Sequence, residues 1–528
     1  MYLCRRLSVP PAEAWGVATF YGLFSTTQRA RRVLHVCDDI ACRTRGAKEI
    51  CAALAKGNTA DGTWLPSPCL GLCDQAPAAL LTEAGPQPKE QLTGAVTAAE
   101  ATAAVRTGTL PDRPRLKVPQ QGDKALRLLA RVGVVDPTDI KAYERSGGFR
   151  ALVRARELGA KAVIQEVTQS GLLGRGGAAF PTGRKWDAVA AQPATPRYVI
   201  CNADESEPGT FKDRVLLEDD PFAIVEAMTI AGFAVGAERG YLYIRGEYPL
   251  GAARITNAVA QARAAGKLDG FEIEVRRGAG AYICGEETAV FNSIEGYRGE
   301  PRNKPPFPVE QGLFRKPTLV NNVETLANIP FIVNEGGAAF AAIGTKDSTG
   351  TRLFCLSGAV ARPGVYEVPF GATLGDLLNL AGAPPAARVR AVLLGGAAGM
   401  FVRGDERDIA LTFEGARAAG VTLGSGVIMV FDDTVDMKDI LLRIAQFFRD
   451  ESCGQCVPCR VGTVRQEEAL HRLMSNRGNG KRRGDHATDL ALLGEIGRAM
   501  KDASICGLGQ TAYSAIESAV NRLGLWSS

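Results

Sequence analysis

The sequence is poor in histidine, nearly balanced in charge and without long apolar runs. Only His35, His471 and His486 occur among its 528 residues, so no general base for proton transfer is obvious. The 62 basic and 57 acidic residues leave a net charge of +5, which argues neither for nor against a nucleic-acid partner. No apolar run approaches the roughly 20 residues that span a membrane, and the N-terminal residues lack the apolar core of a signal peptide. We therefore expect a soluble, cytoplasmic chain without membrane insertion and without a nucleic-acid partner.

The length of the chain predicts roughly three or four domains, each large enough to bury a core of its own. Composition shifts along the sequence suggest where they meet. A small α/β unit with cysteines on its loops comes first, and a proline-rich connection follows it. The predicted boundaries are 1–108, a linker at 109–124, then 125–348, a β-rich module at 349–432 and a helical tail at 433–528.

Thirteen cysteines occur, and eight of them fall into two groups of four. Because a reducing cytosol disfavours disulfides, clustered cysteines in such a chain serve mainly in metal binding or redox chemistry. The first group is a Cx4C pair followed by a Cx3C pair, and the second is a CxxCxxC triplet with a distant fourth cysteine. The first group consists of Cys37, Cys42, Cys69 and Cys73, and the second of Cys453, Cys456, Cys459 and Cys506.

The triplet in the second group predicts a 4Fe-4S cluster. Three thiolates at intervals of three residues can face one cubane if the backbone wraps around it, and Gly454 and Pro458 favour that wrapping. Zinc is the alternative, but zinc sites usually combine two CxxC knuckles rather than three ligands on one loop. The wider gaps of the first group are typical of a 2Fe-2S cluster, with zinc or a chance arrangement as alternatives.

The segment GRGGAAFPTGRKW, residues 174–186, combines four glycines with three cations. Glycine lets the backbone approach a ligand closely, and free N–H groups beside cations favour a phosphate. A glycine-rich turn that serves only the fold is the alternative. Apolar residues at helical spacing precede the segment, whereas a Rossmann fingerprint follows a strand. The segment therefore predicts a nucleotide site in a fold that is not a Rossmann fold.

Further loops carry amides, acids, a lysine and an aromatic ring. They are CNADESEPGTFKDR at 201–214, GAGAYICGEETA at 278–289, NKPPFP at 303–308 and TLVNNVETLANIP at 318–330. The second places two acids where a helix is predicted to begin, and a helix N-terminus favours acids or a bound anion. A solvated acidic turn is the alternative for the first loop. Together these loops predict a site for a large, polar, aromatic cofactor.

These motifs, with ESCGQCVPCR and ICGLG, closely resemble the NADH-binding, FMN-containing flavoprotein subunit of respiratory complex I. The same module forms the diaphorase subunit of NAD-dependent formate dehydrogenases and NAD-reducing hydrogenases. The resemblance covers residues from roughly 125 onward. Separately, GVATFYGLFS and the first cysteine group are similar to the thioredoxin-like 2Fe-2S subunit that accompanies this flavoprotein, here fused in one chain.

The resemblance implies a multidomain α/β fold. Its parts would be a truncated thioredoxin-like 2Fe-2S domain, an FMN- and NADH-binding α/β domain, a β-grasp (ubiquitin-like) module and a C-terminal helical bundle carrying the 4Fe-4S cluster. Two features depart from the family pattern. Ala179 stands where the family usually has glycine, and most of the helical section that normally precedes the thioredoxin-like part is missing. The basic stretch SNRGNGKRRGD at 475–485 is predicted to be an enlarged surface loop.

The resemblance also implies a role for each matching residue, with Glu205 tuning the flavin and no residue acting as a catalytic acid or base. FMN would be bound by Gly174, Arg175, Gly176, Gly177, Gly183, Lys185, Asn202, Asp204, Glu205, Gly285, Glu286, Asn321 and Asn322. NAD(H) would be bound by Phe180 and Phe307 near its adenine, and by Glu207, Glu287 and Lys304 around its ribose and phosphates. The two cysteine groups would hold the 2Fe-2S and 4Fe-4S clusters.

The function implied is an NAD(H)-dependent FMN iron–sulfur oxidoreductase subunit. The fusion favours the diaphorase subunit of a formate dehydrogenase or hydrogenase over complex I, which remains the second hypothesis. Partners would be a catalytic iron–sulfur subunit, such as formate dehydrogenase alpha, a hydrogenase or a complex I subunit, and a small 2Fe-2S subunit. A zinc-stabilised scaffold without catalytic activity is the third hypothesis, and visible absorption would separate it from the other two.

Overall fold

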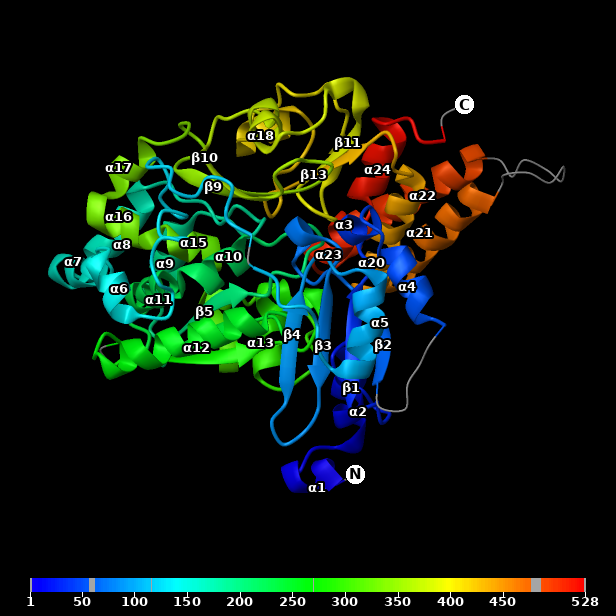
Figure 1. Cartoon of the computed structure of the whole chain (residues 1–528). Helices are drawn as coiled ribbons and strands as arrows, with labels where there is room; N and C mark the ends of the chain where they lie inside the picture. The colour runs from blue at the N-terminus through cyan, green and yellow to red at the C-terminus, as the bar shows by residue number, and fades with distance from the viewer. Residues whose placement is uncertain (1, 57–61, 115, 269, 476–485, 527–528) are drawn as a thin grey trace.

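The computed structural model describes residues 2–56, 62–114, 116–268, 270–475 and 486–526. Within these residues the chain forms three β-sheets with helices packed around them (Figure 1). Of the predicted basic loop at 475–485, all but the first residue lies outside the described residues.

The N-terminal region is a four-stranded mixed sheet with helices. Its elements are Tyr2–Leu7 (α1), Pro11–Phe20 (α2), Arg32–Cys37 (β1), Ile40–Arg43 (α3), Ala47–Leu54 (α4), Gly62–Ser67 (β2), Ala79–Glu83 (β3), Lys89–Thr93 (β4) and Ala98–Thr107 (α5). The strand order is β2-β1-β3-β4, and only β1 and β2 run parallel. Leu34 and Val36 of β1 pack into one apolar cluster with residues of α4 and α5. Thr97 and Glu100 form a capping box that begins α5.

The next region contains a four-stranded parallel sheet. Its elements are Ile140–Arg145 (α6), Arg150–Leu158 (α7), Ala160–Gln169 (α8), Thr182–Ala190 (α9), Tyr198–Ala203 (β5), Lys212–Asp219 (α10), Pro221–Val235 (α11), Arg239–Ile244 (β6), Pro249–Ala264 (α12), Glu272–Arg277 (β7), Glu287–Ile294 (α13), Pro308–Gln311 (α14), Thr318–Asn322 (β8), Val323–Ala327 (α15), Ile329–Glu335 (α16) and Gly337–Ala341 (α17).

The parallel sheet has the order β7-β6-β5-β8, so β5 lies between β6 and β8. Asn202 at the end of β5 pairs in register with Asn322 at the end of β8. The carboxyl edge of a parallel sheet is where such folds commonly bind ligands. The predicted helix before the glycine-rich loop is confirmed as α8, whose buried face includes Val163, Ile164 and Val167.

A five-stranded sheet follows, in the order β10-β9-β13-β11-β12. Its region contains Thr351–Gly358 (β9), Gly364–Pro369 (β10), Leu374–Ala381 (α18), Val389–Leu394 (β11), Met400–Val402 (β12), Phe413–Ala418 (α19) and Val427–Asp432 (β13). Strands β9 and β13 are parallel, and the other neighbours are antiparallel. Every residue of β9 is buried, because one face of this strand packs on the preceding region and the other packs in a separate apolar cluster with α18.

The C-terminal region is helical. Its elements are Met437–Glu451 (α20), Val457–Ser475 (α21), His486–Ala503 (α22), Gly507–Thr511 (α23) and Ser514–Asn521 (α24). Ile440, Leu441, Ile444, Phe447 and Phe448 of α20 are buried, and their spacing places them on one face of the helix, which packs into the core.

The N-terminal region, blue in Figure 1, contacts the parallel-sheet region through β4 and α12, and the C-terminal helices through α3 and α20. Buried ion pairs hold it on both sides. Arg443 of α20 lies 3.2 Å from Asp39, and Arg214 of α10 lies 3.1 Å from Asp74. In the described part of the chain, no helix combines the length and apolarity needed to cross a membrane.

Candidate functional site

A cavity of about 390 Å³ lies at the carboxyl edge of the parallel sheet. Its wall comes from the glycine-rich loop, from the ends of β5 and β8, from the start of α10, from the loop before α13, and from three segments much later in the chain. Half of the residues predicted to bind FMN or NAD(H) line it. They are Gly176, Gly177, Asn202, Asp204, Glu205, Glu207, Gly285, Glu286 and Asn322.

The glycine-rich loop brings bare backbone to the cavity. A Cβ atom on Gly176 would lie 3.2 Å from Cβ of Asn322, and Gly177 has a φ of +118° that disfavours any side chain. The loop is closed by a hydrogen bond from Gly174 N–H to the Phe180 carbonyl, at 2.9 Å. Ala179 also has a positive φ, +52°, which is the conformation that glycine would adopt without strain.

Some predicted residues of this loop and of β8 turn away from the cavity. The Arg175 side chain is fully buried, donates to the Thr349 carbonyl at 2.8 Å and lies over the Phe370 ring, so it holds the loop to the five-stranded region. Gly183 faces α8, where a Cβ atom would lie 2.5 Å from Cα of Thr168. Asn321 accepts a hydrogen bond from the Trp186 indole at 2.9 Å.

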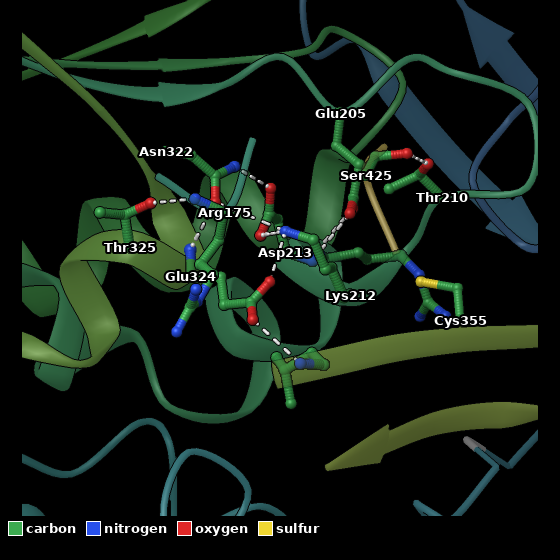
Figure 2. A network of polar contacts seen from close by, with 12 residues as sticks. Arg175, Glu205, Thr210, Lys212, Asp213, Asn322, Glu324, Thr325, Cys355 and Ser425 are labelled. Atoms are coloured by element: carbon green, nitrogen blue, oxygen red, sulfur yellow. Dashed lines mark hydrogen bonds and ion pairs between the residues drawn. The ribbon is translucent and has the colours of Figure 1, made fainter. Parts of the chain in front are cut away.

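Lys212 is a cation in the cavity wall that sequence reasoning missed (Figure 2). Its ammonium lies 2.7 Å from Asp213 and 3.0 Å from Glu324, and these carboxylates hold its pKa above the usual value despite burial. Asn322 donates to Asp213 at 2.6 Å, and Glu324 accepts from the backbone N–H of Leu353 at 2.9 Å. The network therefore fixes a positive charge at the cavity and ties the cavity wall to β9.

Glu205 is buried at the start of α10. Its two carboxylate oxygens accept hydrogen bonds from the backbone N–H groups of Asp213 and Arg214, each at 2.9 Å, so the side chain satisfies donors that a helix start leaves unpaired. Tyr248 also donates to this carboxylate, at 3.1 Å. Burial and the nearby Asp213 raise the pKa of Glu205 to about 8.

Two further carboxyl groups in the wall have raised pKa values because they are buried. Glu207 accepts from the Ala398 N–H at 2.9 Å and from the Ser425 hydroxyl at 2.7 Å, and burial raises its pKa to about 7. Burial raises the pKa of Asp204 well above its usual value, and Oδ2 of Asp204 is a buried atom without a hydrogen-bond partner in the described chain. An unpartnered oxygen in the wall fits a cavity that takes a polar ligand, because buried polar groups are normally paired.

Four charged side chains, which we call the Lys185 cluster, form a chain of ion pairs that begins at the cavity. They are Lys185, Glu286, Glu287 and Lys304. Glu286 lines the cavity and accepts from Lys304 at 2.8 Å, while Glu287 lies 2.9 Å from Lys304 and 3.3 Å from Lys185. As predicted, the two acids stand at a helix start, since Glu286 caps α13 and Glu287 is its first residue. The Phe180 ring lies 5.7 Å from the Lys185 ammonium and is half exposed.

Among the described contacts, Phe307 makes none with the Lys185 cluster. It is exposed and precedes α14, where its N–H donates to Glu310 at 3.1 Å.

The four thiols of the first cysteine group lie together in the interior. The Cys37 thiol is hydrogen-bonded with those of Cys42 and Cys69, and the Cys69 and Cys73 sulfur atoms are 3.4 Å apart. Contacts with the neighbouring thiols and burial raise the pKa of Cys37 and of Cys73 well above the usual value, whereas hydrogen bonds from both of these thiols lower that of Cys69. Four buried cysteines gathered in this way fit an iron–sulfur group, for which four cysteine thiolates are the usual ligand set.

The second cysteine group lies at the junction of α20, α21 and α23. Cys459 is buried and the other three are partly exposed, and Cys506 directly precedes α23. The residues that follow it, Gly507, Leu508 and Thr511, line the same cavity as the glycine-rich loop. Among the described residues, no three His, Cys, Asp or Glu side chains are placed to share a single metal ion.

Sequence reasoning also missed the far wall of the cavity. It is formed by Gly395, Ala398, Thr422, Gly424 and Ser425 around the ends of β11 and β13, and by Gly507, Leu508 and Thr511. The glycines in LLGGAAGM and TLGSG are a signal for bare backbone, but nothing local shows that Ala398 and Ser425 in these segments meet Glu207, which lies 191 and 218 positions earlier in the chain.

Family models match most of the chain in separate segments. The model of the Nuo51 FMN-binding domain matches residues 167–331, and that of the NADH-ubiquinone oxidoreductase-F iron-sulfur binding region matches 439–523. The thioredoxin-like [2Fe-2S] ferredoxin model matches 1–106, and the SLBB domain model matches 353–411. Fold and site thus define a multidomain α/β oxidoreductase subunit with domains for FMN, a 2Fe-2S cluster and a 4Fe-4S cluster.

Similar proteins show to which family within this class the chain belongs. The F 2 subunit of the NADH-quinone oxidoreductase of Rhizobium meliloti (strain 1021) is 42% identical over 404 residues, which are 74% of this chain and 94% of that protein. The HndC subunit of the NADP-reducing hydrogenase of Solidesulfovibrio fructosivorans is 42% identical over 413 residues, 75% of this chain and 82% of that protein. The chain belongs to the family of NADH-quinone oxidoreductase F subunits.

A solved structure matches more of the chain than these relatives do. The crystal structure of an NAD+-reducing [NiFe]-hydrogenase in the air-oxidized state contains a chain that is 34% identical, with a TM-score of 0.84. The match covers 99% of this chain and 90% of that one. It therefore extends over the N-terminal region as well as the flavin-binding and C-terminal regions.

Proposed function

We propose that this chain moves electrons between NAD(H) and a partner enzyme through FMN bound in the cavity and iron–sulfur clusters on both cysteine groups. One observation carries the proposal. A single cavity is lined by the glycine-rich loop and by Gly507, Leu508 and Thr511, so the predicted nucleotide floor and the segment directly after the predicted cluster ligand Cys506 share one wall. When bound, FMN accepts the two electrons of NADH as a hydride and passes them on one at a time.

In this proposal the residues of the cavity wall bind and orient the flavin. Gly176 and Gly177 let the ring and chain of FMN approach the backbone, while Asn202, Asn322 and Asp204 present polar atoms to it. Glu205, Gly285 and Glu286 complete its surroundings, and Lys212 adds the fixed positive charge found above. Four other predicted residues do not contact the flavin but hold the glycine-rich loop and the end of β8 in place. They are Gly174, Arg175, Gly183 and Asn321.

The Lys185 cluster would receive NAD(H). Glu287 accepts the ribose hydroxyls and Lys304 faces the phosphates. Lys185, which the resemblance assigns to FMN, lies 3.3 Å from Glu287 and is therefore also within reach of NAD(H). Phe180 and Phe307, both half exposed, offer rings for the adenine to stack on. Glu207 lies at the cavity end of this path.

The cluster ligands would be Cys37, Cys42, Cys69 and Cys73 for 2Fe-2S, and Cys453, Cys456, Cys459 and Cys506 for 4Fe-4S. With these assignments the domains would run over 1–108, 125–348, 349–432 and 433–528, with a linker at 109–124. The five-stranded sheet with α18 would be a β-grasp module, and the C-terminal helices a bundle that carries the 4Fe-4S cluster.

The parent complex would be a cytoplasmic NAD-reducing hydrogenase or NAD-dependent formate dehydrogenase. The match of the hydrogenase chain over 99% of this chain supports this choice, because the fused N-terminal region is included. The partners would then be a catalytic iron–sulfur subunit and a small 2Fe-2S subunit. NADH-quinone oxidoreductase is the second candidate, supported by the 42% identity to the F 2 subunit of that enzyme.

Filling the cavity tests where FMN binds. A Cβ atom on Gly507 would meet no other atom within 4 Å, so Gly507→Leu places its side chain in open space at the cavity wall. We expect the variant to lose FMN affinity at least about tenfold, measured by quenching of flavin fluorescence on the full chain. Gly494→Leu on α22 is the control, because Gly494 lies outside the cavity. Unchanged FMN affinity in Gly507→Leu would place the flavin elsewhere.

A further inference from the structure

Two buried arginines of the parallel-sheet region hold the loop that carries Cys69 and Cys73. Arg245, directly after β6, donates to the Cys69 carbonyl at 2.6 Å. Arg214 on α10 donates to the Gly71 carbonyl at 3.0 Å and pairs with Asp74 at 3.1 Å. Both side chains are buried, so the contacts are shielded from water and salt.

The same two arginines also hold Glu205 in the cavity wall. The second guanidinium nitrogen of Arg245 donates to the Glu205 carbonyl at 2.6 Å, and the backbone N–H of Arg214 donates to the Glu205 carboxylate at 2.9 Å. Arg245 is itself held by Glu247 at 3.1 Å and lies against the Tyr248 ring. One guanidinium group therefore bridges a predicted cluster ligand and a residue of the cavity, the latter seen in Figure 2.

Tyr248 adds a third contact between the loop and Glu205. Its hydroxyl donates to the Glu205 carboxylate at 3.1 Å. A Cβ atom on Gly71 would lie only 2.2 Å from that hydroxyl oxygen, and Gly71 has a φ of +70°. The cysteine loop thus packs against Tyr248 with no spare volume. Because protein interiors are close-packed, a displacement of the loop must move Tyr248 and Arg245 as well.

We propose that Arg245 is a positioning residue, supported by Arg214 and Tyr248, through which cluster assembly on the first cysteine group sets the affinity of the cavity for flavin. The proposal rests on the proposed function, which assigns a cluster to Cys69 and FMN to the cavity. With four thiolates drawn to a cluster, the Cys69–Asp74 loop takes one position, and Arg245 transmits it to the Glu205 carbonyl. Without the cluster the loop is less constrained, and the wall at Glu205 is less well ordered for FMN.

Such coupling is reciprocal and measurable as a ratio of binding constants. Coupling between sites typically changes affinity by about 5- to 150-fold, and we expect about tenfold here. A merely structural role of Arg245 would instead weaken flavin binding by the same factor whether or not the cluster is present.

A double-mutant cycle separates these cases. The dissociation constant of FMN is measured by fluorescence quenching on the full chain in the wild type, Cys69→Ser, Arg245→Gln and the double variant. Electron paramagnetic resonance of each reduced sample reports the 2Fe-2S signal independently. Arg443→Gln, alone and with Cys69→Ser, is the matched control, because Arg443 also anchors the N-terminal region through a buried ion pair but makes no contact with Glu205 among the described bonds.

We expect Cys69→Ser to raise the dissociation constant about tenfold in the wild-type and Arg443→Gln backgrounds, and less than about twofold in Arg245→Gln. Equal factors in all three backgrounds would overturn the coupling and leave the cluster assignment standing, provided that the 2Fe-2S signal is lost. Retention of that signal in Cys69→Ser would overturn the ligand assignment together with the coupling. If Arg245→Gln does not fold, Arg245→Lys replaces it, since one ammonium cannot bridge both carbonyls in the same geometry, and full coupling in that variant would equally refute the proposal.

Discussion

Replacing Glu287 with alanine is expected to change which nicotinamide nucleotide the chain prefers. The Glu287 carboxylate lies close to both Lys185 and Lys304. Burial alone would raise the pKa of Glu287, but the two lysines outweigh burial and hold the pKa below its usual value, so the group is ionised at neutral pH. In its proposed role it accepts the ribose hydroxyls of NAD(H) and repels the 2′-phosphate of NADP(H). Its removal ends this repulsion and leaves the Lys185 ammonium without a carboxylate partner among the described ion pairs, so that Lys185 can attract the phosphate, while Lys304 keeps its pair with Glu286.

The size of the effect follows from the exposure of the site. Two unit charges about 4 Å apart interact by about 4 kcal/mol at an effective dielectric constant of about 20, and by about 1 kcal/mol in bulk water. The Glu287 side chain is 28% exposed, which places the pair between these limits. We therefore expect the ratio of kcat/KM for NADPH to kcat/KM for NADH to rise at least about tenfold. This factor corresponds to a change of about 1.4 kcal/mol in the relative stabilisation of the two transition states.

The assay is ferricyanide reduction with each nucleotide, measured at low and high ionic strength. Activity with NADH should fall because ribose hydrogen bonds are lost, while kcat/KM for NADPH should rise. Glu287→Gln is the control, since glutamine keeps the shape and one hydrogen-bond acceptor but removes the charge, and it should reproduce the gain with NADPH. An unchanged NADPH to NADH ratio in both variants would show that Glu287 does not discriminate between the nucleotides, and Glu207 would be the next residue to replace.

Three other outcomes are expected. Cys456→Ser should abolish the 4Fe-4S signal in electron paramagnetic resonance while FMN and ferricyanide reduction by NADH persist, and an unchanged spectrum would contradict the ligand assignment. Glu205→Gln should raise the FMN reduction potential only above about pH 8, where Glu205 with its raised pKa carries a charge to remove, and a shift of equal size at pH 6 would count against this reasoning. Ala179→Gly should stabilise the loop by up to about 1.5 kcal/mol, because the left-handed backbone of Ala179 costs about 1–2 kcal/mol and the added freedom of glycine costs about 0.5–1 kcal/mol. An earlier thermal release of FMN would refute this expectation.

The sequence predicted the parts of the site that depend on local pattern. Helical spacing located α8 before the glycine-rich loop, and the acids at the start of α13 lie where the helix-start argument put them. Strand register explains how two of the predicted residues come together, because the parallel pairing of β5 with β8 places Asn202 beside Asn322. Motifs at the ends of neighbouring parallel strands thus converge without any signal beyond their position.

The positions of Arg175 and Lys212 depend on long-range packing, which the sequence alone does not reveal. Arg175 belongs to a run of cations beside glycines, yet its side chain is directed to carbonyls 174 and 176 positions further along the chain. Lys212 has no local signal that distinguishes it from a surface lysine, but Glu324 on a different helix holds it in the cavity wall. Contacts of this kind depend on how the five-stranded region docks on the parallel sheet, and no periodicity or spacing encodes that docking.

The chain that joins the N-terminal region to the cavity region has a further consequence. Residues 108–114 and 116–139 contain no helix or strand, so the two regions are connected by irregular backbone within one polypeptide. Linked partners meet at an effective concentration on the order of millimolar, whatever the dilution of the protein. The contacts of Arg245 and Arg214 with the cysteine loop therefore re-form after each opening, where two separate subunits would drift apart. Translation of one message also fixes a one-to-one ratio of cysteine loop to cavity.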